Sequence, residues 1–192
     1  MPGVDHIVLV RHGETEWSTS GQHTGNTDIP LTDMGRRQAE ALGARLAAWN
    51  FGRVLSSPLS RALETCRLAG LGERVEVTDD LREWDYGDYE GRRTADIRQE
   101  RPGWDLWLHG VPGGESVDDV GQRADRVLDL ARGSAGHVAL FAHGHVLRVA
   151  GARWMGLPAV NGGRLGLSTA TISVLSWERE RPVLHRWNDE AG

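Results

Sequence analysis

Two polar triplets stand directly after short apolar runs in this chain of 192 residues. Arg-His-Gly at 11–13 follows the run 6–10, and His-Gly-His at 143–145 follows the run 137–142. Each apolar run is typical of a buried strand that delivers polar side chains at its carboxyl end. Because ligands of α/β sheets bind beyond the carboxyl ends of the strands, we expect both triplets to face one crevice.

Four side chains predicted to meet in that crevice favour phosphate chemistry. Arg11, His12 and His143 belong to the triplets, and Arg61 lies just beyond a further predicted strand at 54–57. A guanidinium stays charged at any working pH, and its planar fork of donors matches phosphate or carboxylate oxygens. A neutral imidazole can attack phosphorus. The set therefore indicates phosphoryl transfer through a phosphohistidine, with the arginines stabilising charge on the phosphoryl oxygens.

Alternating strands and helices predict the fold that holds these residues. Apolar spacings of three and four indicate helices, most clearly at 117–131 behind the capping pair Ser116 and Asp119. We expect an α/β fold: a three-layer sandwich with a mostly parallel sheet and helices on both faces, in a single domain over 1–192. Residues 81–114 are predicted to form a small insertion of loops and short helices over the site. The other predicted helices are 32–49, 59–71 and 146–155, and the other predicted strands are 75–77, 170–177 and 182–187.

The composition argues against several classes of protein. All 22 basic residues are Arg, so no lysine chemistry is available, and the net charge of −5 lacks the broad positive field of sequence-independent nucleic-acid binders. The single Cys66 cannot form an internal disulfide, which favours a reducing compartment. The apolar run at 7–10 is too short for a signal sequence or a membrane span. We expect a cytoplasmic protein without nucleic-acid or membrane partners.

The segment 9–17, Leu-Val-Arg-His-Gly-Glu-Thr-Glu-Trp, resembles the signature of the histidine phosphatase superfamily in its phosphoglycerate-mutase-like branch. Further blocks continue the resemblance in the same order along most of the chain. They are Thr24-Gly25 with 30–32, Ser56-Ser57-Pro58 with Arg61 and Thr65, then 81–87, 113–116 and 142–145. This ordered set is far more specific than an Arg-His-Gly triplet alone.

The resemblance implies a role for each candidate residue. His12 would be the nucleophile that becomes phosphorylated, and Arg11, Arg61 and His143 would form the phosphate pocket around it. Glu83 stands at the position of the proton donor, which requires a raised pKa; we expect the substrate phosphate and the neighbouring Trp84 to raise it. No metal and no cofactor are implied. The implied substrate contacts are Thr24, Gly25, Tyr86 and Gly144, with His23, His145, Arg92 and Arg148 as candidates for the distal part of the substrate.

The length of the insertion and the lack of lysine favour hydrolysis over a mutase reaction. Mutases of this superfamily carry a longer insertion with a Lys and an Arg pair that hold the second acidic group of phosphoglycerate. Here only about two dozen residues separate Gly91 from Glu115, and the pair Arg92-Arg93 does not match that position. Mutase-type phosphoryl transfer is therefore the alternative to a phosphatase.

Three stretches point to a substrate class. Residues 20–25, Ser-Gly-Gln-His-Thr-Gly, residues 81–91, LREWDYGDYEG, and the Trp-x-x-Trp-x-x-Gly cadence at 104–110 are similar to sedoheptulose-bisphosphatase-type and bacterial acid phosphatases. The resemblance implies a small phosphorylated metabolite as substrate, in particular a sugar phosphate. Dimers are common among such proteins, so the resemblance is compatible with a homodimer.

Two rival interpretations come from other classes of function. Metal-dependent hydrolysis could use His143 and His145 as a ligand pair with His12, but such sites usually also need carboxylates, and Asp is missing near these strand ends. A non-catalytic binding module is expected to have lost the nucleophile or an arginine, whereas all of these residues are present. The sequence therefore favours a metal-independent enzyme.

Overall fold

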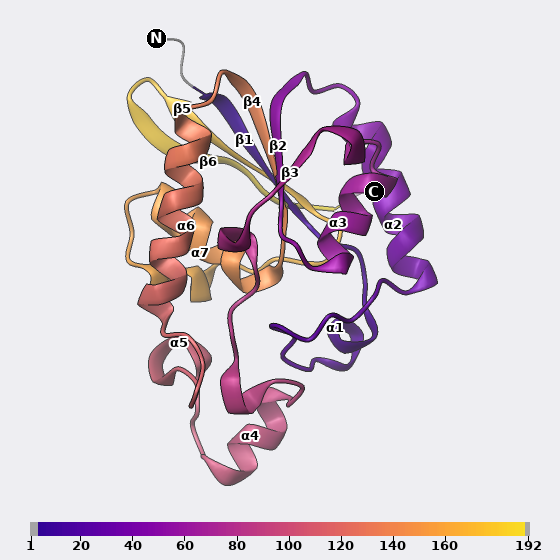
Figure 1. Ribbon diagram of the computed structural model, residues 1–192. Coiled ribbons are helices and arrows are strands. Elements are labelled where there is room, and N and C mark those ends of the chain that lie inside the picture. The colour runs from indigo at the N-terminus through magenta and orange to yellow at the C-terminus, as the bar shows by residue number, and fades with distance from the viewer. Residues whose placement is uncertain (1–3, 191–192) are drawn as a thin grey trace.

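The computed structural model describes residues 4–190, which contain a mixed sheet of six strands (Figure 1). The strands are β1 (Val4–Arg11), β2 (Phe51–Ser56), β3 (Val75–Val77), β4 (Gly136–Ala142), β5 (Ile172–Glu178) and β6 (Arg181–Asp189). Their order is β3-β2-β4-β1-β5-β6, and the first four of these run parallel. β5 is antiparallel to both β1 and β6. The sheet is mostly parallel, as the sequence predicted.

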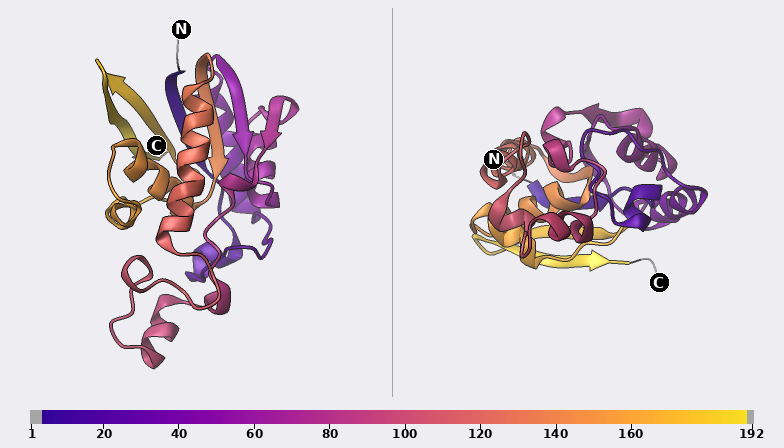
Figure 2. Two further views of the ribbon diagram at one scale, coloured as in Figure 1. Left: turned by 60° about the vertical axis from the view of Figure 1, so that its left-hand side comes forward. Right: turned by 90° about the horizontal axis from the view of Figure 1, so that it is seen from below.

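Helices cover both faces of the sheet (Figures 1 and 2). α2 (Asp33–Leu46) and α3 (Ser60–Leu68) lie on one face, and α6 (Val117–Arg132) and α7 (Gly144–Trp154) lie on the other. Val8 of β1 packs into the core on the α2 and α3 side, and Leu9 packs into the core on the α6 and α7 side. Because β1 is buried on both faces, its sequence is a continuous apolar run rather than an alternating one. The predicted three-layer α/β class is confirmed.

The neighbouring strands β1 and β4 bring the two triplets together. The two strands are parallel, with Arg11 opposite Ala142, so His12 and His143 leave the sheet at the same edge. The His12 N–H donates to the Ala142 carbonyl over 3.0 Å, which extends the pairing by one residue. His143 is then the N-cap residue of α7. The expected convergence of the triplets follows directly from this strand pairing.

Most predicted elements are present, with ends that differ by a few residues. α6 begins with the predicted capping box, in which Ser116 and Asp119 exchange hydrogen bonds. α3 ends at Leu68 rather than at residue 71, because Gly70 turns the chain in a left-handed conformation (φ +81°). Trp49, the last residue of the helix predicted at 32–49, lies beyond the end of α2 and packs beside the ring of Phe51.

Residues 81–114 form turns and short helices near the carboxyl ends of the parallel strands (Figure 1). They contain η3 (Gly87–Tyr89), α4 (Thr94–Glu100) and α5 (Leu106–His109). Further 3-10 turns are η1 (Gly72–Arg74), η2 (Asp79–Leu81) and η4 (Ala159–Arg164). The sequence did not predict α1 (Glu16–Ser20), which follows β1 and lies at the same end of the sheet. Within 4–190, no helix has the length and the apolar character that a membrane span requires.

Candidate active site

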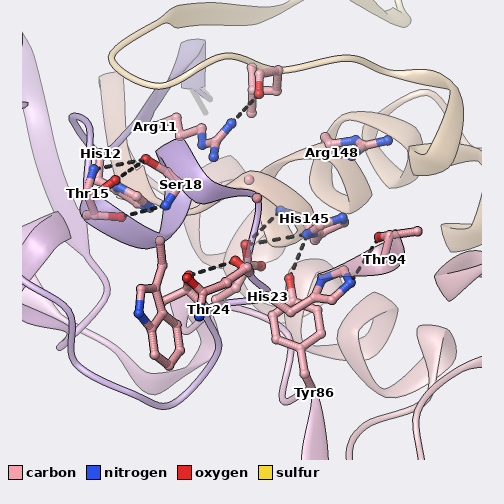
Figure 3. A pocket seen from close by; sticks show the side chains of 16 residues that line it. Arg11, His12, Thr15, Ser18, His23, Thr24, Tyr86, Thr94, His145 and Arg148 are labelled. Carbon is pink, nitrogen blue, oxygen red and sulfur yellow. Dashed lines mark hydrogen bonds and ion pairs between the residues drawn. The ribbon is translucent and has the colours of Figure 1, made fainter. Parts of the chain in front are cut away.

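A pocket of about 250 Å³ opens where β1 and β4 end (Figure 3). Four parts of the chain far apart in sequence form its wall: the end of β1 with the following residues up to Thr24, the segment 81–114, the first turns of α7, and Leu167. The expected site residues on this wall are Arg11, His12, His23, Thr24, Glu83, Tyr86, Gly144, His145 and Arg148. The pocket is thus the crevice that the two triplets predicted.

The His12 ring is buried and held in one orientation. Its Nδ1 lies 2.7 Å from the carbonyl oxygen of Gly13. Because a carbonyl can only accept, Nδ1 carries the proton of the neutral ring and Nε2 keeps its lone pair. Burial, then the charges of Arg61 and Arg11, lowers the pKa of His12 to about 3. His12 is therefore a neutral imidazole with a free electron pair at Nε2 near neutral pH.

Gly13 holds the loop after His12 against α2 and α3. Its N–H donates to Thr65 Oγ1 over 3.1 Å. A Cβ atom at this position would stand 2.3 Å from the carbonyl oxygen of Gly35, which no side chain tolerates. The glycine of the Arg-His-Gly triplet is required because two backbone segments meet here.

Arg11 carries an unpartnered donor beside His12. Its Nη1 donates to the Leu167 carbonyl, whereas its buried Nε has no hydrogen-bond partner among residues 4–190. Gly144 leaves room for the guanidinium, since a Cβ there would lie 3.3 Å from Arg11 Cζ. Buried polar groups are nearly always paired in native proteins, so a charged N–H without a partner suits an anionic ligand.

Arg61 is fully buried and uses its guanidinium to hold protein groups. Its Nε donates to His143 Nδ1 over 3.1 Å, and Nη1 donates to the Thr27 carbonyl over 3.0 Å. Nη2 donates to the carbonyls of Gly25, over 2.9 Å, and Thr24, over 3.1 Å. The Arg61 side chain is not part of the pocket wall. The structure places Arg61 behind the site as a positioning residue, and direct contact with phosphate stays a prediction.

His143 lies between Arg61 and His12. Since Arg61 can only donate, Nδ1 of His143 accepts, and the proton of the neutral ring sits on Nε2, which lies 2.8 Å from Ser57 Oγ. Burial and the charge of Arg61 hold the pKa of His143 well below its usual range. The rings of His143 and His12 are 5.1 Å apart between centroids. Both nitrogens of His143 are thus engaged, which leaves neither free for the metal site considered above.

Glu83 is an ionised carboxylate rather than a proton donor at rest. It is buried, and its Oε1 accepts from the N–H groups of Trp84 and Val146, each over 2.9 Å. Its Oε2 accepts from the N–H of His145 over 2.9 Å. Burial by itself would raise the pKa of Glu83, but the contacts with His145, its main-chain N–H included, and the charge of His143 outweigh burial and hold the pKa well below the usual range. A raised pKa of Glu83 in the presence of the substrate phosphate stays a prediction.

Tyr86 and His145 form a hydrogen-bonded pair on the wall. The Tyr86 hydroxyl lies 2.6 Å from His145 Nδ1, which is also 3.7 Å from Glu83 Oε2. Burial and the charges of Glu83 and Glu90 raise the pKa of Tyr86 well above its usual value, so the phenol stays protonated. His23 packs against the Tyr86 ring at 4.8 Å between centroids. Figure 3 shows these side chains together on one side of the pocket.

Two expected substrate contacts do not lie on the wall. The Gly25 N–H donates to Glu90 Oε1 over 2.8 Å, so it braces the loop 24–28 rather than facing the pocket. Arg92 pairs with Glu100 at 2.6 Å and lies outside the pocket. In both cases an acidic side chain from elsewhere in the fold binds the expected contact group, and contact of these two residues with substrate stays a prediction.

Several wall residues were not singled out from the sequence: Thr15, Trp17, Ser18, Gly21, Gln22, Thr94 and Leu167. Thr15 and Ser18 form the capping box of α1, a Thr-x-x-Ser pattern that is visible in the sequence. Leu167 contributes a main-chain carbonyl to Arg11, and no side-chain pattern signals such a contact.

The buried neutral histidines predict that acid destabilises the fold. The pKa is about 3 for His12 and about 4 for His23, the latter lowered by burial and His145, whereas unfolded histidine titrates near pH 6.5. Between these values only the unfolded chain binds the protons, so stability falls as pH drops from about 6.5 towards 4. Each histidine contributes about 1.4 kcal/mol per pH unit.

Urea unfolding between pH 7.5 and 4.5 measures this dependence. His23→Asn is expected to lower the slope of the unfolding free energy against pH by the contribution of one histidine. A free energy of unfolding that stays constant between pH 7 and 5 would contradict the neutral buried state of these rings.

Comparisons with known proteins identify the family of the chain. The family model of the histidine phosphatase superfamily (branch 1) matches residues 7–190. An acid phosphatase of Mycobacterium tuberculosis is 46% identical to the chain, over 90% of this chain and 86% of that protein. A sedoheptulose 1,7-bisphosphatase of Saccharomyces cerevisiae is 38% identical, over 78% of this chain and 67% of that protein.

A solved structure of an open reading frame product of Mycobacterium tuberculosis has the same fold, with a TM-score of 0.90. It is 41% identical and covers 97% of this chain, with 98% of its own length matched. The family match spans nearly all described residues, including both triplets and the pocket between them. The chain therefore belongs to the histidine phosphatase superfamily and is a phosphoric monoester hydrolase.

Proposed function

We propose that the protein is a metal-independent phosphomonoesterase that hydrolyses small phosphorylated metabolites, chiefly sugar phosphates, through a phosphohistidine at His12. The observation that carries the proposal is the lone pair of His12 Nε2, held by the Nδ1 contact to Gly13 in a pocket that also contains the unpartnered Nε of Arg11. Nε2 attacks phosphorus while the bond from phosphorus to the ester oxygen breaks. Water then attacks the phosphohistidine, and the electron pair of the N–P bond returns to His12.

The start of α7 supports binding of the phosphoryl group. Gly144 is the first residue of this helix of 11 residues, and its N–H has no acceptor among the described residues. A helix N-terminus carries partial positive charge and favours an anion. Together with Arg11, it offers preorganised donors for the oxygens of the transferring group, which is the main source of stabilisation in phosphoryl transfer.

The rest of the wall suits a hydroxylated substrate body. Ser18, Gln22, His23 and Thr94 offer neutral hydrogen-bonding groups, and Trp17 offers an aromatic face. Such groups can bind sugar hydroxyls without demanding further charge on the substrate. The name of the sedoheptulose bisphosphatase relative supports the same substrate class.

A panel assay on the chelator-treated protein tests the proposal. Sugar phosphates, phosphoglycerates and an aryl phosphate are compared while both free phosphate and isomerised product are followed. We expect phosphate release, with a sugar phosphate preferred, at a rate that chelator does not change. Isomerised phosphoglycerate without net phosphate release would instead identify a mutase, and loss of activity with chelator would contradict the metal-independent route.

A further inference from the structure

The guanidinium of Arg11 relies on one protein acceptor for its orientation. Among residues 4–190, its side chain has a single hydrogen-bond partner, the main-chain carbonyl of Leu167, which accepts from Nη1. Arg61, by contrast, makes four hydrogen bonds while fully buried. A donor that stabilises a phosphoryl group must already point in the right direction before the substrate arrives. The position of the Leu167 carbonyl therefore determines where Arg11 presents its unpartnered Nε.

Leu167 belongs to an irregular loop, residues 165–171, that connects η4 to β5. The loop lies against the first triplet: the Ala170 N–H donates to the His12 carbonyl over 3.0 Å, and the Thr171 carbonyl accepts from the Arg11 N–H over 3.3 Å. Ala170 has a left-handed conformation (φ +53°), which residues other than glycine rarely adopt. Such a conformation persists only where surrounding contacts impose it. The loop therefore needs contacts from another element to keep its shape.

The end of β6 provides these contacts, chiefly through the side chain of Asn188. Asn188 Oδ1 accepts from the Ser168 N–H over 2.6 Å, and Nδ2 donates to Ser168 Oγ over 3.5 Å. The neighbouring Trp187 donates its indole N–H to the Gly166 carbonyl over 2.6 Å. The residues on both sides of Leu167 are thus bound to β6, which fixes the carbonyl between them.

A bulge in β6 directs Asn188 to the loop. Trp187 and Asn188 together stand opposite the single residue Ser173 of β5, where the register of the two strands shifts. Asn188 has a left-handed conformation here (φ +53°), which asparagine adopts more readily than most residues. Its N–H donates to Ser173 Oγ over 3.0 Å. Bulges of this kind change the direction of a side chain and are frequent near active sites.

We propose that Asn188 is a positioning residue of the active site, which holds the Leu167 carbonyl and through it the Arg11 guanidinium. Asn188 lies outside the pocket wall, so it acts through the loop 165–171 and not on the substrate. Without its side chain, Ser168 loses two hydrogen bonds and the Leu167 carbonyl loses its fixed position. The inference rests on the proposed contact between Arg11 and the phosphoryl group.

Asn188→Gly tests the proposal, because glycine accepts the left-handed backbone and removes only the side chain. With 4-nitrophenyl phosphate, which has no sugar body, kcat/KM is expected to fall by about 10- to 100-fold, since small displacements of positioning groups have effects of this size. The inhibition constant of inorganic phosphate probes the Arg11 contact without a chemical step and is expected to rise by about tenfold.

Asn188→Asp is the conservative variant that is expected to restore both constants to near their wild-type values. A carboxylate oxygen still accepts from the Ser168 N–H, and the Ser168 hydroxyl can rotate to donate to the other oxygen. If Asn188→Asp were impaired as severely as Asn188→Gly, the hydrogen bonds to Ser168 would not be the cause and the proposal would be wrong.

A double-mutant cycle with Arg11→Ala separates positioning of Arg11 from a general structural effect. Because both substitutions act on the same interaction, Asn188→Gly is expected to lower kcat/KM by less than about twofold once Arg11 is absent. Equal losses with and without Arg11 would overturn the proposal. Asn188→Ser, whose shorter side chain leaves the Ser168 N–H without its acceptor, gives the same readout if the Gly variant does not fold.

Arg179→Gly is the matched control for the change of backbone. Arg179 is an exposed residue in the turn between β5 and β6, and it also has a left-handed conformation (φ +56°). Replacing it by glycine makes the same backbone change outside the pocket wall, so both kinetic constants are expected to stay at their wild-type values. A similar loss in Arg179→Gly and Asn188→Gly would show that the loss comes from the backbone of the strand pair and would contradict the proposal.

The outcomes also distinguish the inference from the function on which it rests. Wild-type kcat/KM and wild-type phosphate inhibition in Arg11→Ala would overturn the proposed contact of Arg11 itself. A large loss in Arg11→Ala, together with wild-type kinetics in Asn188→Gly, would overturn only the role of Asn188.

Discussion

His12→Ala is expected to lower turnover by about 10⁴-fold or more, as removal of a covalent nucleophile does in other enzymes. The substitution removes the Nε2 lone pair and with it the only route through a phosphohistidine in the proposed mechanism. Arg11 and the Gly144 N–H remain, so substrate is expected still to bind. The release of phosphate measures turnover. Labelled enzyme trapped after a base quench shows whether a phosphohistidine still forms.

The fold of this variant is expected to survive. His12 makes one side-chain hydrogen bond, to the Gly13 carbonyl, and loss of that partner costs about 1–3 kcal/mol. Removing a histidine that is neutral when buried also makes the protein less sensitive to acid. His185→Ala, at an exposed position on β6, is the control for a general effect of replacing histidine. Turnover of His12→Ala near the wild-type rate would exclude His12 as the nucleophile.

Arg61→Lys is expected to impair activity by about 10²-fold or more and to destabilise the fold by about 3–5 kcal/mol. The guanidinium makes four hydrogen bonds while fully buried, one to His143 and three to main-chain carbonyls of the segment 24–27. An ammonium cannot reproduce this planar fork, so several buried acceptors lose their donors. His143 and the loop that carries Thr24 then lose their fixed positions beside His12.

Thermal unfolding and steady-state kinetics measure both effects. Arg36→Lys is the matched control, because Arg36 lies on α2 and pairs with Asp33 and Glu64 with 41% of its side chain exposed. Such surface pairs contribute little to stability, so this variant is expected to unfold at nearly the same temperature as the wild type. Near-normal activity and stability of Arg61→Lys would show that the fork at position 61 is not required.

The framework of the site could be predicted because its signals are local. Residues 7–10 are all apolar. Such a continuous run indicates a strand that is buried on both faces, even when its neighbouring strands are not known. Ser116 and Asp119 cap α6 through hydrogen bonds within four residues. Polar triplets after two such strands placed His12 and Gly144 on one wall, since parallel strands end at the same edge.

The chemistry of individual side chains depended on residues distant in sequence. Glu83 has its pKa lowered chiefly by His145, which lies about sixty positions further along the chain. Arg61 uses its donors on the loop 24–27 and His143 rather than on the pocket, and Arg92 is bound by Glu100. These outcomes depend on which groups the fold brings within hydrogen-bond distance.

The sequence alone therefore determined the α/β class, the meeting of the two triplets and the identity of His12 as the candidate nucleophile, because hydrophobic periodicity and short motifs act over a few residues. Only the tertiary structure decided that Glu83 is ionised, that Arg61 stands behind the pocket and that His145 lies between Tyr86 and Glu83. Charge and protonation follow from burial and from partners supplied by other elements, and these exist only after the chain has folded.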